Sequence, residues 1–286
     1  MQKRRIGNVT VSAIGLGAMP LSTKDDRPSR EEAIGVVHAA LDAGVTLIDT
    51  ADAYARDEAE FGHNESLVAE ALAAYGPGAD DVLVATKGGH TRRGTEWELD
   101  GSPTYLRRAC EASLRRLGGD AIGLYQFHRP DPETPWEESM QGLRHLVDAG
   151  LVRMVGVSNA DIAQIDVARS VLGEALVSVQ NQFSPGWRFS ADELTHCAGH
   201  DLAWLPWSPF GGVSSAGSLP ATAPAFAEVA EELGVSVYQV TLAWHLAQAD
   251  VVIPIPGASR ASSIQDSAAA AELTLSDDQL ARLNTP

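Results

Sequence analysis

The feature that most constrains the fold of this 286-residue chain is a series of short apolar runs that alternate with amphipathic segments. Nearly continuous apolar runs of this length predict strands that are buried on both faces, and their alternation with helices predicts a parallel sheet. Eight such units in one chain favour a closed (β/α)8 barrel, or TIM barrel, over an open sheet. The runs lie at residues 13–17, 45–49, 82–86, 122–127, 153–157, 176–180, 203–207 and 251–255.

The segments between these runs carry the signals that begin and end helices. Ser29 and Glu32 have the spacing of a capping box, and the pairs Ser236/Gln239 and Ser276/Gln279 repeat it. Strand and helix are therefore predicted to alternate almost to the end of the chain.

Two additions to the barrel are expected. The pair Gly7-Asn8 predicts a β-hairpin before the first barrel strand, because both residues can adopt the positive φ angles of a two-residue turn. Residues 208–234 form a longer crossover rich in Gly, Ser, Ala and Pro, which predicts a loop over the barrel mouth and one extra helix in the C-terminal part. Without an internal linker, residues 1–286 are predicted to form a single barrel domain.

Composition argues against several classes of partner. A net charge of −17 disfavours nucleic acid and anionic membranes, since both require a basic surface. No apolar run approaches the roughly 20 residues of a membrane span, and Met1-Gln-Lys-Arg-Arg leads into no apolar signal core, so we expect a soluble, cytoplasmic monomer. Cys110 and Cys197 are predicted to be reduced core thiols.

Four residues near the predicted strand ends carry the candidate chemistry, because strand ends of a parallel barrel converge on one mouth. Asp49 ends the second run and is the natural charge partner of Lys87, which closes the third. A charged lysine near Tyr54 should lower the pKa of the phenol and make it a better proton donor near neutral pH. His128 follows the fourth run and could polarise a carbonyl. The set predicts a site that protonates an oxygen while another group attacks carbon.

These positions fall within segments that resemble the aldo-keto reductase family along nearly the whole chain. They include Asp-Thr-Ala-x-x-Tyr, Thr-Lys-Gly, Tyr-Gln-Phe-His-Arg-Pro-Asp, Gly-Val-Ser-Asn and Ile-Pro-Gly-Ala-Ser. The family's catalytic tetrad matches Asp49, Tyr54, Lys87 and His128. The resemblance implies an enzyme that reduces an aldehyde or ketone to an alcohol with NADPH, with Tyr54 as the proton donor.

The same resemblance implies an extended NADP(H) bound without a Rossmann fold, in keeping with Gly15-Leu-Gly17, which lacks the third glycine of that fingerprint. It assigns Ser158, Asn159 and Gln180 to the carboxamide and Trp207 to the nicotinamide ring. It assigns Ser208, Pro209, Phe210 and Gly211 to the pyrophosphate, Ser259, Arg260, Asp266 and Ser267 to the adenosine end, and further contacts to Gly17, Met19, Asp49 and Gly257. Arg260 is the only cation in residues 256–267, so NADPH is favoured over NADH by a single charge.

A small carbonyl compound is the expected substrate, since no cation cluster is apparent that would clamp a phosphorylated one. We expect its pocket to involve Met19, Tyr54, Trp97, His128 and Trp187, the tryptophans lying in loops near the mouth. His90 has no evident companion and is given no role. His196 and His200 have helical spacing but no third ligand in the sequence, so no metal is expected.

Two other functions remain open. A strand-end lysine in a barrel can form a Schiff base, which would make the protein an aldolase acting through Lys87, although a carboxylate at Asp49 keeps the amine protonated. A barrel can also bind a nicotinamide and report its redox state with little turnover.

Overall fold

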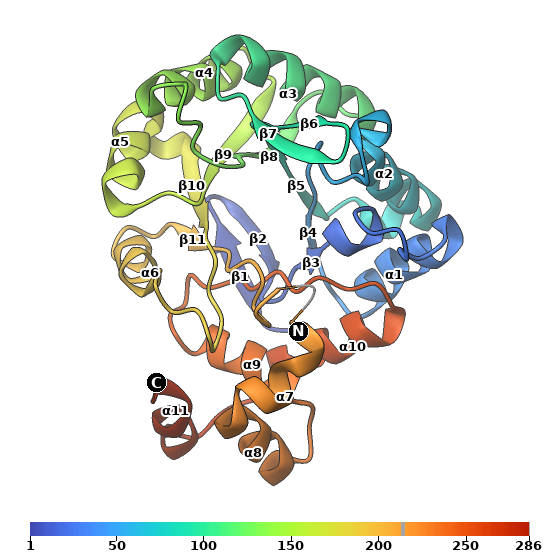
Figure 1. The fold of residues 1–286 in the computed structure, drawn as a ribbon, viewed down its shortest axis with the longest axis vertical. Helices are drawn as coiled ribbons and strands as arrows, with labels where there is room; N and C mark the ends of the chain where they lie inside the picture. The colour runs from blue at the N-terminus through green and yellow to red at the C-terminus, as the bar shows by residue number, and fades with distance from the viewer. Residues whose placement is uncertain (213–214, 286) are drawn as a thin grey trace.

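A computed structural model describes residues 1–212 and 215–285. Its centre is a parallel sheet of seven strands in the order β11-β10-β9-β8-β5-β4-β3, curled inside a ring of helices (Figure 1). The strands are β3 (Leu16–Gly17), β4 (Leu47–Asp49), β5 (Leu83–Gly88), β8 (Ile122–Phe127), β9 (Val152–Ser158), β10 (Leu176–Gln180) and β11 (Ala203–Trp204).

The gap between β11 and β3 is closed by residues 251–257. The amide of Trp204 donates to the carbonyl of Val251, at 2.8 Å. On the other side the amides of Gly15 and Gly17 donate to Pro254 and Pro256, both at 2.9 Å. Because prolines have no N–H to donate, the predicted eighth strand pairs irregularly. The closed (β/α)8 architecture itself is confirmed.

Helices lie outside the strands, as Figure 1 shows. Those of the barrel units are α1 (Arg30–Asp42), α2 (His63–Tyr75), α3 (Pro103–Leu117), α4 (Trp136–Asp148), α5 (Ile162–Leu172), α6 (Ala191–Ala198), α9 (Val237–Leu246) and α10 (Ala261–Ala269). The capping boxes at Ser29 and Ser276 are both formed. Ser236 caps α9, but the side chain of Gln239 donates to Asp266 and closes no box.

The predicted N-terminal hairpin is present as β1 (Lys3–Ile6) and β2 (Val9–Ser12). Only Gly7 of its turn has a positive φ, of 55°, so the expectation that Asn8 shares it was wrong. Residues 208–234 contain α8 (Pro224–Leu233) and the short α7 (Leu219–Thr222), and α11 (Asp277–Asn284) follows the barrel. A second hairpin, β6 (His90–Arg93) with β7 (Glu96–Leu99), was not predicted.

The inward face of the barrel is set by the two-residue period of its strands. Leu47, Leu83, Leu124 and Met154 fill the interior together with Ile6 of the hairpin. Their sequence neighbours instead pack outward against the helices, as Ile48, Tyr125 and Val155 do. Continuing the same alternation by two residues turns Asp49 inward after Leu47.

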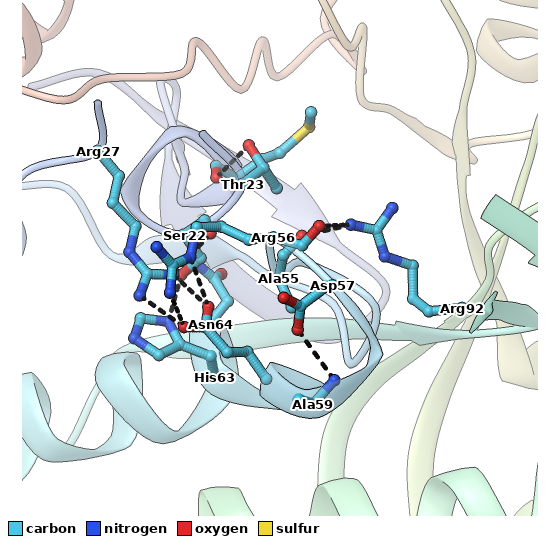
Figure 2. A network of polar contacts seen from close by, with 12 residues as sticks. Ser22, Thr23, Arg27, Ala55, Arg56, Asp57, Ala59, His63, Asn64 and Arg92 are labelled. Carbon is cyan, nitrogen blue, oxygen red and sulfur yellow. Dashed lines mark hydrogen bonds and ion pairs between the residues drawn. The ribbon is translucent and has the colours of Figure 1, made fainter. Parts of the chain in front are cut away.

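A network of polar contacts fixes the loop that carries Tyr54 (Figure 2). The hydroxyl of Thr50, at the start of this loop, donates to Oδ1 of Asn64 on α2 at 2.6 Å. Arg92 reaches the loop from β6 and donates to the carbonyl of Ala55 at 2.7 Å. Arg27 forms a two-pronged ion pair with Glu60, at 2.6 and 3.1 Å. The loop is therefore held by groups from three different segments.

Remaining expectations concern the thiols and membrane association. Cys110 and Cys197 are free and buried, as predicted. Within the described ranges, no helix combines the length and the apolar character needed to cross a bilayer.

The closure of the barrel can be tested at Gly17. A Cβ there would lie 2.8 Å from the carbonyl oxygen of Ile255, so Gly17→Ala should lower the free energy of unfolding by about 1–3 kcal/mol. Gly35→Ala is the control, because in the described part of the chain no atom lies within 4 Å of the added Cβ, and loss of a helical glycine should stabilise by about 0.5–1 kcal/mol. Urea unfolding curves in which both variants shift alike would contradict this difference.

The Glu60 ion pairs can be tested by their pH dependence. Hydrogen bonds from Arg56 and Arg27 lower the pKa of Glu60 from 4.5 to about 2. Since the folded-state pKa is depressed, the stabilisation is complete above about pH 4.5 and is lost as the pH falls toward 2. Glu60→Gln should cost about 1 kcal/mol at pH 7 and less at pH 3, measured by urea unfolding. The control is exposed Glu174→Gln, and a Glu60 deficit that grows on acidification would refute the assignment.

Candidate active site

The carboxyl ends of the strands open into a cavity of about 850 Å³. Tyr54 and His128 lie in its wall, and the cavity continues to Arg260 and Asp266 at α10. Most residues expected to bind cofactor or substrate line it: Gly17, Met19, Asp49, Tyr54, Trp97, His128, Ser158, Asn159, Gln180, Trp207, Ser208, Pro209, Phe210, Gly257, Ser259, Arg260, Asp266 and Ser267.

A buried ion pair lies beneath this cavity. Lys87 on β5 is fully buried, and its Nζ lies 2.5 Å from Oδ1 of Asp49, which is 2% exposed. The ammonium also donates to the carbonyl of Thr50 at 2.8 Å and to the hydroxyl of Tyr54 at 3.0 Å. Burial lowers the pKa of Lys87, but the charge of Asp49 and the contact with Tyr54 outweigh it and raise the pKa overall. The amine is therefore held protonated.

Two glutamines bind the other oxygen of Asp49. Nε2 of Gln180 donates to Oδ2 at 2.8 Å, and Nε2 of Gln126 donates to it at 3.1 Å. Gly156 leaves room for this arrangement, because a Cβ there would lie 2.9 Å from Cγ of Gln126. Our sequence reasoning missed Gln126, although it follows inward-facing Leu124 by two residues on β8.

Tyr54 is 8% exposed, and its hydroxyl accepts the hydrogen bond from Lys87. Burial raises the pKa of Tyr54, and the charge and hydrogen bond of Lys87 only partly offset that effect. The expectation of a lowered pKa was therefore wrong in this structure, because the cost of burying a phenolate exceeds what Lys87 recovers. The phenol remains protonated at neutral pH while Lys87 reduces the cost of losing its proton.

His128 lies beside Tyr54 in the cavity wall, and the two rings meet edge-to-face, with centroids 5.6 Å apart and an interplanar angle of 78°. Burial, reinforced by the charge of Lys87, holds the pKa of His128 well below its usual value, so its ring is neutral. Its Nδ1 is buried without a hydrogen-bond partner in the described ranges. The sequence analysis assigned no role to His90, yet His90 also lines the cavity, with its ring 4.4 Å from that of His128.

The groups between the two ends of the cavity are held by local hydrogen bonds. Oγ of Ser158 donates to the carbonyl of Gln180 at 2.6 Å. Asn159 has φ 58° and donates through Nδ2 to the carbonyl of His128 at 3.1 Å. Ser208 likewise has a left-handed backbone, at φ 51°. Trp207 and Phe210 provide aromatic walls here.

The end of the cavity at α10 offers a mixed set of groups. Arg260 is the N-cap residue of α10, and Ser259, Ser262 and Ser263 surround it in the cavity lining. Both oxygens of Asp266 are occupied, by Oγ of Ser236 and Nε2 of Gln239, each at 2.6 Å. The aromatic walls at Trp207 and Phe210, together with a guanidinium and hydroxyls at a helix N-terminus, fit an extended phosphorylated dinucleotide.

Two expected residues are placed elsewhere. Gly211 is not among the described residues that line the cavity, although Gly212 is. Trp187 is also absent from that described lining, and it is 43% exposed, with its ring 5.0 Å from that of Phe189. Loop conformation was not readable from the sequence. Arg129, whose Nη2 donates to Asn159 at 3.3 Å, is a cation in the cavity wall that we did not anticipate.

The histidine pair outside the barrel does have a third potential ligand, contrary to our expectation. Asp166 of α5 lies 2.9 Å from Nε2 of His196, and His200 completes a set of ligand atoms within 4.8 Å of one another. Arg169 also binds the same oxygen of Asp166, at 3.0 Å. The carboxylate is thus already engaged by a guanidinium that would repel a cation.

Comparisons with known proteins agree with this geometry. Residues 13–285 match the model of the Aldo/keto reductase family. The 6-dehydroglucose reductase of Novosphingobium aromaticivorans is 37% identical, over 93% of this chain and 89% of its own length. Glycerol dehydrogenase from Gluconobacter oxydans superposes with a TM-score of 0.84 at 27% identity, covering 99% of this chain and 94% of that one.

A third relative was solved with a cofactor. The aldo/keto reductase from Klebsiella pneumoniae, in complex with NADP and acetate, superposes with a TM-score of 0.82 at 27% identity, over 99% of this chain and 94% of that one. The match to the family extends over nearly the whole chain, and the barrel and the cavity described above lie within it. This chain therefore belongs to the aldo/keto reductase family.

Proposed function

We propose that the protein reduces the carbonyl group of a small aldehyde or ketone to an alcohol, with NADPH as reductant and Tyr54 as proton donor. The observation that carries the proposal is the contact of Tyr54 with the buried ammonium of Lys87, at 3.0 Å, in the wall of a cavity large enough for a dinucleotide and a small substrate.

Each of these residues has one task. When bound, the nicotinamide supplies a hydride to the carbonyl carbon. Tyr54 gives its proton to the carbonyl oxygen, and the resulting phenolate is stabilised by the charge of Lys87. Neutral His128 can donate a hydrogen bond from the ring edge that faces the cavity and so orient the carbonyl. Asp49 keeps Lys87 charged throughout.

The residues along the cavity would hold the cofactor. Trp207 would flank the nicotinamide, and Ser158 and Asn159 would bind its amide. Arg260 and the serines around it would bind the phosphate of the adenosine end, which favours NADPH over NADH. The Klebsiella relative was solved with NADP, in keeping with this choice.

Relatives support a substrate that carries hydroxyl groups. One is named for 6-dehydroglucose and another for glycerol, and both compounds are rich in hydroxyls. We propose a hydroxylated carbonyl compound in preference to a plain aliphatic one.

A Schiff-base mechanism is disfavoured by the contacts of Lys87. Its Nζ donates to Asp49, to the carbonyl of Thr50 and to Tyr54, so an unprotonated amine would lose several interactions. A sensor with little turnover would share the geometry, and turnover with a panel of carbonyl compounds discriminates between the two.

Replacing the proton donor tests the proposal most simply. Tyr54→Phe should lower turnover at least ~100-fold, as expected for loss of a general acid, while NADPH affinity stays within a few-fold of wild type. NADPH oxidation and fluorescence titration measure the two quantities. Tyr75→Phe, on the outer helix α2, should leave both unchanged. Full turnover by Tyr54→Phe would remove Tyr54 from this role.

A double substitution can separate the role of the Asp49–Lys87 ion pair in turnover from its role in stability. Asp49→Asn alone leaves the ammonium of Lys87 buried without its counter-charge and should cost about 3 kcal/mol of unfolding free energy. Adding Lys87→Met removes that charge and should restore most of the stability, but not turnover. Urea unfolding and NADPH oxidation report on the two effects. A double variant less stable than either single one would contradict this reading of the pair.

A further inference from the structure

The hairpin formed by β6 and β7 brings a second histidine to the reaction site. It follows β5 directly, so His90 is only three residues beyond Lys87. The backbone of His90 is fixed by the hydroxyl of Tyr105, which donates to its carbonyl at 2.9 Å. The ring of His90 meets that of His128 at a centroid distance of 4.4 Å and an angle of 90°.

The hydrogen bonding of His90 fixes which nitrogen carries its proton. Nδ1 lies 3.2 Å from the carbonyl oxygen of Glu98. A carbonyl can only accept, so Nδ1 carries the hydrogen and Nε2 of the neutral ring is an acceptor. Burial lowers the pKa of His90 to about 4, which the hydrogen bond to Glu98 only partly opposes, so the ring stays neutral at physiological pH.

That acceptor is not fully buried. Within residues 1–212 and 215–285, Nε2 has no hydrogen-bond partner. It is also not one of the fully buried atoms that lack a partner, so part of it is accessible. His90 lines the cavity wall, so the exposed part of its ring edge opens there. An acceptor without a partner beside the reaction site is suited to a hydroxyl donor and offers nothing to a carbonyl oxygen.

Trp97 provides an apolar surface beside this acceptor. Its ring lies 5.2 Å from that of His90 at an angle of 77°, and the side chain is 41% exposed and lines the cavity. The guanidinium of Arg92 lies 4.1 Å over the indole, and Arg92 is anchored on the Tyr54 loop through the carbonyl of Ala55. The indole is therefore held in place at the cavity wall.

We propose that His90 is a specificity residue whose Nε2 accepts a hydrogen bond from a hydroxyl on the carbon next to the substrate carbonyl, while Trp97 packs against the carbon chain. This inference rests on the proposed function, because it places the carbonyl between Tyr54 and His128. It assigns the selection of hydroxylated over plain carbonyl compounds to the β6–β7 hairpin.

A matched pair of substrates tests the assignment. His90→Phe keeps an aromatic ring against His128 and Trp97 but removes the acceptor, so kcat/KM for glyceraldehyde should fall about 10-fold. For propanal, which lacks the hydroxyls, kcat/KM should stay within about 3-fold, since it never used the acceptor. His90→Gln offers an amide oxygen and should recover part of the loss with glyceraldehyde. His145→Phe, an exposed histidine on α4, should change neither value.

The outcomes separate this inference from the proposed function. An equal loss for both substrates, or no loss for either, overturns the role of His90. If wild type turns over neither substrate, tryptophan fluorescence of the NADP-loaded protein is titrated with glycerol instead. Glycerol binding that is weakened by His90→Phe would then support the hydroxyl subsite while the proposed reductase function fails. Equal glycerol binding by both proteins, or none by wild type, would overturn the subsite.

Discussion

The site depends on one buried charge. Lys87 is fully excluded from solvent, and an ammonium in that position is tolerated only because Asp49, a backbone carbonyl and the Tyr54 hydroxyl together replace its hydration. Asp49 in turn accepts hydrogen bonds from two glutamines, Gln126 on β8 and Gln180 on β10. The carboxylate of Asp49 and its partners thus join four strands. They also fix the ammonium of Lys87 relative to the hydroxyl of Tyr54.

The loop that brings Tyr54 to this charge is anchored by polar contacts. Asn64, Arg27 and Arg92 hold it from three segments of the chain, and the guanidinium of Arg92 also lies over the ring of Trp97. Tyr54, the proposed proton donor, and Trp97 in the cavity wall therefore share Arg92 as an anchor. Such preorganisation matters because a hydrogen-bond donor stabilises a transition state only when it points at the atom on which charge develops. A mobile loop would lose that advantage.

Much of this arrangement was predictable because it follows from strand periodicity. The two-residue alternation that turns Leu47 inward also turns Asp49 inward, and convergence of the strand ends brings Lys87 and His128 to the same mouth. The same rule would have found Gln126, had it been applied one position before the strand end.

Other features depend on the balance of opposing energetic effects or on loop conformations, and no sequence pattern reveals either. The direction of the Tyr54 pKa shift follows from burial outweighing Lys87, and burial depends on how the loop closes over the phenol. His90 acquires its neighbours only because residues 90–99 form a hairpin, whereas Trp187 pairs with Phe189 away from the cavity. Similarly, Pro254 and Pro256 turn the eighth strand into an irregular closing segment.

The coupling between Lys87 and the phenol is the central claim, and a direct titration of Tyr54 tests it. Protein labelled with ¹³C at the tyrosine Cζ, with the Tyr54 signal assigned by Tyr54→Phe, would be titrated by NMR in the wild-type and Lys87→Met backgrounds. We predict a Tyr54 pKa above the usual tyrosine value in the wild type and a further rise when the ammonium is removed. An unchanged or lower pKa in Lys87→Met would contradict the claim that Lys87 stabilises the phenolate.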